Sequence, residues 1–178
     1  MKSILRTAAA GLAIASFGIA SSASAATDTA DVTAEILSTL QVVVDPADNS
    51  LNFAEIADAG LTASSTVTVD PDGTRTCGAD LLCSGTANAP TFTITGLPGS
   101  TVIVSFPDAS IELTRGGVEP AGMSGVMDVD TFTTDLVGNQ VLLVTGEADF
   151  HIGGTLTVNQ LQAPGIYTGA VDVEVQYN

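Results

Sequence analysis

Two cysteines are the residues of this chain best placed to do covalent chemistry. Cys77 and Cys83 are separated by residues 78–82. A catalytic redox pair more often has the C-x-x-C spacing, and a metal site would need further ligands nearby. In an exported chain, this pair therefore predicts a structural disulfide across a tight loop. The loop-entropy model gives so small a ring about 2 kcal/mol of stabilisation.

Few other side chains offer catalytic or metal-binding chemistry. His151 is the only histidine, it lies between two apolar residues, and no G-x-S-x-G sequence accompanies it. Asp128, Asp130 and Asp135 lack the spacing, the glycine and the final glutamate of an EF-hand calcium loop. We therefore expect no enzyme activity and no cofactor.

The charge of the chain excludes one class of partner. The sequence has 20 acidic residues against four Lys and Arg, and its formal net charge is −16. Beyond the N-terminal segment only Arg75 and Arg115 are basic. Because nothing neutralises phosphate, nucleic acid is excluded as a partner and an anionic lipid surface is disfavoured.

Residues 1–25 are predicted to be a secretory signal peptide. Lys2 and Arg6 form a positive n-region, an apolar run over 8–20 follows, and Ala23 and Ala25 give an A-x-A cleavage site. The apolar run is too short for an ordinary transmembrane helix. We expect a mature chain that begins at Ala26, crosses the inner membrane by export and does not insert stably into a membrane.

The rest of the sequence predicts a single all-β domain, either a sandwich or a barrel. Val, Thr, Ile and Leu dominate, turn residues recur about every eight to twelve positions, and no helical period is sustained. Nine or ten strands are expected, and the turn signal at Pro98-Gly99 predicts a hairpin. The main expected strands are 51–56, 65–70, 92–95, 101–106, 111–114, 126–132, 141–145, 148–152, 155–158 and 166–177.

Both ends of the predicted mature chain alternate between apolar and polar residues. The C-terminal end predicts a half-buried strand, which no later strand follows. The N-terminal end predicts an extended arm over 26–37, followed by a sandwich domain over 38–178. The alternating apolar residues are Ala30, Val32, Ala34 and Ile36 in the arm and Val171, Val173, Val175 and Tyr177 in the C-terminal strand.

Three segments carry a family resemblance. They are Phe-Thr-Ile-Thr-Gly-Leu-Pro-Gly at 92–99, Ile-Gly-Gly-Thr-Leu-Thr-Val at 152–158 and Gln-Ala-Pro-Gly-Ile-Tyr-Thr-Gly at 162–169. Together with the strand at 51–53, they resemble a family of small exported β-proteins from Gram-negative bacteria called domain of unknown function 4402. That family is in turn similar to the subunits of chaperone–usher fimbriae.

The resemblance implies an immunoglobulin-like antiparallel β-sandwich that lacks its last strand. A periplasmic chaperone would first supply that strand, and the N-terminal arm of the next subunit would then replace it. The resemblance thus makes Ala30, Val32, Ala34 and Ile36 the candidate donor residues and Val171, Val173, Val175 and Tyr177 the candidate wall of the acceptor groove. Such subunits commonly have a penultimate tyrosine, which Tyr177 matches. Their disulfide usually joins the first strands of the domain, so the pair Cys77 and Cys83 does not support the assignment.

The function implied is a structural subunit of a surface fimbria or related secreted assembly. Its partners would be further copies or related subunits, a chaperone and an usher, and it would pass from the periplasm to the cell surface. The alternative is a complete sandwich, with the N-terminal strand filling the gap in its own domain. That arrangement fits a monomeric secreted adhesion module that binds carbohydrate or matrix, although few aromatic residues and no Trp are present to stack on sugars.

Overall fold

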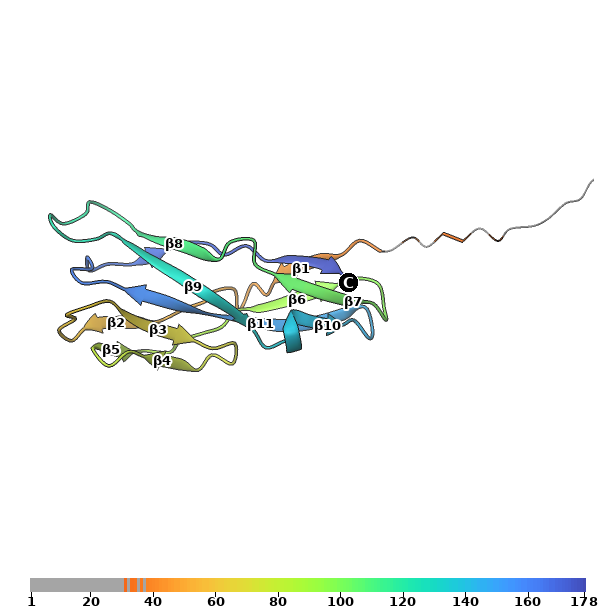
Figure 1. Ribbon diagram of the computed structural model, residues 1–178, viewed down its shortest axis with the longest axis horizontal. Helices are drawn as coiled ribbons and strands as arrows, with labels where there is room; N and C mark the ends of the chain where they lie inside the picture. Colours follow the sequence, from red (N-terminus) through yellow and green to blue (C-terminus); the bar gives the residue numbers. More distant parts are fainter. Residues whose placement is uncertain (1–30, 32, 35, 37) are drawn as a thin grey trace, which may run out of the picture. The chain divides into compact units, whose positions relative to one another are not determined.

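The computed structural model describes residues 31, 33–34, 36 and 38–178. The predicted signal peptide and the donor-arm residues Ala30 and Val32 lie outside the described residues. The chain divides into two units, Met1–Glu35 and Ile36–Asn178, and all strands of the described residues belong to the second (Figure 1).

The second unit is an all-β sandwich, as predicted, and every pair of its strands is antiparallel. Within the described residues the one helical element is a 3-10 turn, η1 (Val137–Asn139). The strands are β1 (Gln41–Val44), β2 (Glu55–Asp58), β3 (Ser65–Val69), β4 (Arg75–Cys77), β5 (Leu81–Ser84), β6 (Thr91–Thr95), β7 (Thr101–Ser105), β8 (Ser110–Arg115), β9 (Val126–Thr134), β10 (Gln140–Leu142), β11 (Glu147–Val158), β12 (Tyr167–Thr168) and β13 (Glu174–Tyr177).

The long strand β11 organises the sheets. Its first half pairs with β6, and its second half lies between β3 and β9. The largest sheet has the order β1-β6-β11-β9-β8-β12, to which β3 and β4 are attached through β11. A three-stranded sheet, β10-β7-β13, and the pair β2-β5 complete the unit (Figure 1).

The core consists of two hydrophobic clusters, and β11 contributes to both. Leu156 and Val158 belong to the first cluster, while Phe150 and Ile152 belong to the second. The remaining buried residues of the first cluster are Phe53, Val67, Val69, Leu81, Ala89, Met127 and Val129. Those of the second are Ile94, Val102, Val104 and Leu143.

The predicted hairpin of 92–95 and 101–106 is wrong. Both strands exist, but β6 pairs with β1 and β11, whereas β7 pairs with β10 and β13. The chain crosses between sheets at Pro98-Gly99 because Ile94 and Val102 must reach the same core cluster from two layers. A hairpin would have kept both side chains on one sheet.

Gly153 and Gly154 do not end a strand, contrary to the prediction of two pieces. β11 runs through both glycines, and its pairing with β9 shifts register there. A Cβ atom on Gly153 would collide with the Val69 carbonyl oxygen and lie 2.9 Å from Pro71 Cδ. The absence of a side chain therefore allows β3 to lie directly against the middle of β11.

The predicted disulfide is present between Cys77 and Cys83, whose Cα atoms are 6.5 Å apart. The segment is not the loop expected from the sequence, because Cys77 ends β4 and Cys83 lies within β5. Since β4 pairs with β3 and β5 pairs with β2, the bond ties the small β2-β5 sheet to the main sheet.

Both arginines of the described residues bind backbone carbonyl groups. Arg75 Nη1 donates to the carbonyl oxygens of Phe53 and Ser84, at 2.9 and 3.0 Å. Arg115 Nε donates to the Pro164 carbonyl oxygen at 2.6 Å, and its Nη1 donates to the Val118 carbonyl oxygen at 2.9 Å. Each guanidinium thus fixes a loop beside a strand.

We expect Gly153→Ala to lower the free energy of unfolding by about 1–3 kcal/mol, because the new methyl group overpacks the contact between β3 and β11. Chemical denaturation measures this change. Gly116→Ala is the matched control, since no atom lies within 4 Å of the Cβ position at Gly116. Equal stability of the two variants would show that the close approach of β3 to β11 does not depend on the missing side chain at Gly153.

Candidate functional site

The C-terminal segment alternates as predicted but is not one strand. Tyr167–Thr168 (β12) pairs with β8, whereas Glu174–Tyr177 (β13) pairs with β7 in the other sheet. Residues 169–173 belong to neither strand. A continuous strand is prevented because the chain changes sheets here, passing so close to β8 that a Cβ on Gly169 would lie 2.7 Å from Leu113 Cδ2.

The four predicted acceptor residues share one environment. Every second residue is half-buried and packs against the second core cluster, while the polar residues between them are exposed. The half-buried residues are Val171, Val173, Val175 and Tyr177. A row of apolar side chains is thus only partly covered by the described chain.

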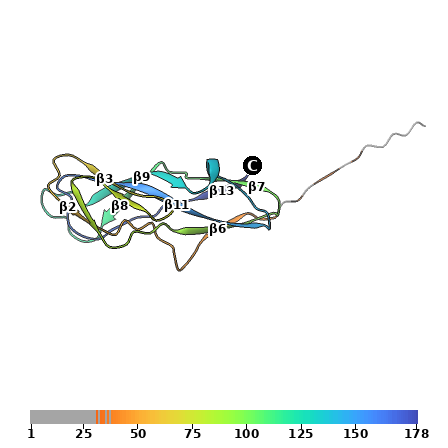
Figure 2. The same cartoon turned by 90° about the horizontal axis from the view of Figure 1, so that it is seen from below.

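The strand β13 is a sheet edge. It pairs with β7 on one side, and no strand of the described residues pairs with its other side. In the opposite layer β1 is also an edge, since it pairs with β6 alone within the same part of the chain. The inward residues Leu40 and Val42 pack against the same cluster as β13. Figure 2 shows β6 in the layer opposite β7 and β13.

We call the space between the free edges of β1 and β13 the opening. Tyr177 closes one end of it. Its hydroxyl accepts a hydrogen bond from the Leu97 backbone N–H at 2.8 Å and donates one to the Ser38 carbonyl oxygen at 3.0 Å. A Cβ on Gly96 would lie 2.8 Å from this hydroxyl and 2.9 Å from Leu40 Cδ1. This end of the opening therefore has no room for a further large side chain.

The other end of the opening is hollow. A cavity of about 310 Å³ lies beside Val171, with a mainly apolar lining. Phe92, one of its walls, stacks on Phe150 with ring centroids 5.4 Å apart. Its apolar walls include Leu51, Phe53, Phe92, Ile111, Leu113 and Val171. Sequence reasoning missed this cavity because its walls come from separate segments, each of which reads as an ordinary core strand.

Two of the predicted donor residues are described. Ala34 and Ile36 are both exposed, and Ile36 retains 93% of its accessible surface. An isoleucine in this state contributes nothing to the core of its own unit. Strand β1 begins only at Gln41 and pairs with β6, not with β13.

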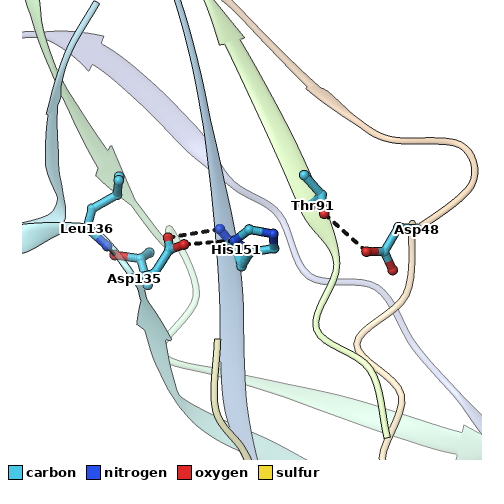
Figure 3. A network of polar contacts seen from close by, with 6 residues as sticks. Asp48, Thr91, Asp135, Leu136 and His151 are labelled. Atoms are coloured by element: carbon cyan, nitrogen blue, oxygen red, sulfur yellow. Dashed lines mark hydrogen bonds and ion pairs between the residues drawn. The ribbon is translucent and has the colours of Figure 1, made fainter. Parts of the chain in front are cut away.

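His151 contacts the carboxylate of Asp135 and lies outside this opening. Its Nδ1 is 2.7 Å from Asp135 Oδ2, its backbone N–H donates to Asp135 Oδ1 at 2.9 Å, and both side chains are about 40% exposed. Figure 3 shows this pair beside a separate one, in which Thr91 Oγ1 donates to Asp48 Oδ2. The two contacts between His151 and Asp135 hold β11 to the residue that follows β9.

A second cavity, of about 420 Å³, has Asp48, Asp72, Asp135 and His151 among its lining residues. The backbone N–H and the hydroxyl of Thr74 donate hydrogen bonds to Asp72 and lower the pKa of this carboxyl group. The Asp72 carboxylate therefore stabilises the turn in which it lies. The described residues contain no group of three or more His, Cys, Asp or Glu that could hold a metal ion. No helix in this part of the chain has the length and apolar character to cross a membrane.

The fold and the site define the class of protein, an all-β sandwich with a free, half-covered sheet edge. A family model described as Domain of unknown function (DUF4402) matches residues 42–177, and the chain belongs to this family, as its sequence predicted. No curated protein and no solved structure matches the chain.

We expect Tyr177→Phe to lower the free energy of unfolding by about 1–2 kcal/mol, because the variant leaves the Leu97 N–H without its acceptor. Thermal or chemical denaturation tests this expectation. Ser38→Ala is the control, since it removes only the long, exposed contact of 3.4 Å between the Ser38 and Tyr177 hydroxyls and keeps the Ser38 carbonyl that accepts from Tyr177. Its stability should stay near that of the unchanged protein. If Tyr177→Phe left the free energy of unfolding unchanged, the hydroxyl would not be what holds this end of the opening together.

Proposed function

We propose that the protein is a structural subunit of a surface fimbria or related secreted assembly and polymerises by donor-strand addition. The observation that carries the proposal is the free edge of β13, together with the half-covered apolar row that runs from this strand back to Val171, where the row meets a cavity. In this role the chain acts as a building block and not as an enzyme.

An unpaired sheet edge presents backbone N–H and C=O groups that an incoming strand can pair with. Strand addition uses these groups for affinity, and the alternating side chains set the register. Burying two to four apolar side chains of a donor arm would contribute about 5–8 kcal/mol before the entropy of association is subtracted. The partly covered row over residues 171–177 supplies the matching surface.

The donor would be the arm over 26–37 of a second copy. Donation from one copy into the next is a heterologous contact, and when such a contact does not close on itself it produces a filament. The same edge would be an aggregation hazard before assembly. A periplasmic chaperone that covers the edge, and an usher that passes subunits to the cell surface, are therefore the expected partners.

The proposal predicts that the exported form, residues 26–178, assembles into a concentration-dependent ladder of oligomers and that deletion of 26–37 leaves monomers. Size-exclusion chromatography with light scattering measures both. An added arm peptide should bind the monomeric deletion variant and raise its melting temperature without restoring oligomers, because a free peptide fills the groove but connects no second subunit.

The alternative function, a monomeric adhesion or carbohydrate/matrix-binding module, predicts the opposite behaviour. A protein of that kind stays monomeric with the arm present and binds its ligand in that state. Assembly that is unchanged by the deletion would also exclude the arm as donor.

A further inference from the structure

The geometry points to one register for the added strand, an inference that rests on the proposed function. Ile36 of a second copy fills the cavity beside Val171, and Ala30 of the same arm lies opposite Tyr177. The arm then runs antiparallel to β13. In this arrangement each inward residue of the arm faces an inward residue of the acceptor, and the pairs are Ala30 with Tyr177, Val32 with Val175, Ala34 with Val173 and Ile36 with Val171.

The lengths of the two segments agree. Ala30 to Ile36 and Val171 to Tyr177 each contain four inward positions at every second residue. At the rise of an extended strand, the arm from Ala30 to Ile36 would span about 20 Å. The acceptor segment keeps the same two-residue alternation of half-buried and exposed residues over 171–177, although only Glu174–Tyr177 pairs with β7. No inward position of either segment is left unmatched, whereas a shift by two residues leaves one unmatched in each.

The sizes of the side chains select the direction. The opening is packed at the Tyr177 end, where Leu40 and Gly96 leave no space, and hollow at the Val171 end, where the cavity has about 310 Å³. Ile36 is the largest inward residue of the arm, and Ala30 is among the smallest. The antiparallel direction puts the large side chain into the hollow and the small one at the packed end.

An arm that ran parallel to β13 would not fit, because its side-chain sizes would not match the space at the two ends of the opening. It would press Ile36 against the Tyr177 hydroxyl, which already contacts Ser38 and Leu97. It would also leave Ala30 to fill the cavity, where a single methyl group would cover little of the apolar lining. Antiparallel addition also matches the existing partner of β13, since β7 pairs with it in that direction.

The register has one electrostatic cost. The outward residues of the arm face those of the acceptor, which places Glu35 of the second copy opposite Asp172. Asp172 is exposed, so salt screens the repulsion between the two carboxylates. Assembly should therefore proceed further at 0.5 M NaCl than at low ionic strength.

The first test is a matched pair of charge insertions in the full chain over 26–178. We expect Ile36→Asp to weaken assembly about tenfold or more, because it replaces a buried apolar side chain by a carboxylate in an apolar cavity. Val118→Asp should leave assembly unchanged, since Val118 is 92% exposed and contributes nothing to the groove. Both sites are almost fully exposed in the subunit, so folding is unaffected in either variant. Equal assembly of the two variants would overturn the placement of Ile36.

The second test reads the register by oxidative cross-linking. Full chains carrying Ala34→Cys together with Val173→Cys should form a covalent ladder under a mild oxidant, because facing residues of paired strands bring their Cβ atoms within about 4.5–5.5 Å. Ala34→Cys with Val175→Cys, and Ala34→Cys with Val171→Cys, are the shifted controls.

The cross-linking outcomes distinguish the register of the added strand from donor-strand addition itself. A ladder from a shifted pair in place of the predicted pair overturns the register and leaves donor-strand addition standing. Covalent closure within single chains means that the arm completes its own domain, and it overturns both. Absence of a ladder from all three pairs, in a protein that still assembles, also overturns both.

Discussion

The continuous pairing of β11 is the constraint on which the rest of the structure depends. This strand contributes buried side chains to both hydrophobic clusters and pairs with three other strands. It can do so only because Gly153 and Gly154 allow neighbouring chain to approach at its centre. A strand broken at the glycines would separate the two clusters, and the second cluster would lose Phe150 and Ile152.

The candidate site is a consequence of how β11 distributes its partners. Its first half holds β6 and, through β6, the edge strand β1. The opposite layer ends at β13, so both edges border the same cluster and leave its side partly open. Tyr177 fastens one end of this opening to the chain that leads into β1. Of the residues that could bind an added strand, Glu174–Tyr177 are held by β7 in the three-stranded sheet, whereas Val171 and Val173 are held by their packing against the second cluster.

The sequence predicted what is encoded locally. Alternation at Val171 to Tyr177 correctly indicated which side chains turn inward, and the spacing of the two cysteines correctly indicated their disulfide. The pairing of strands could not be predicted in this way. Pro98-Gly99 is equally compatible with a hairpin and with a crossing between layers, and Gly153-Gly154 is equally compatible with a turn and with close packing. The neighbours that decide each case are distant in the sequence, and so are the walls of the cavity beside Val171.

The two arginines bind carbonyl oxygens, which leaves the carboxylates of the described surface almost without cationic partners. The contact between His151 and Asp135, which is an ion pair when the imidazole is protonated, is the only salt bridge within the described residues. A filament of such subunits would be a polyelectrolyte, with charge repeated along its axis and a condensed layer of counterions around it. Its stiffness and its spacing from neighbouring filaments would then follow the ionic strength and the valence of the surrounding cations.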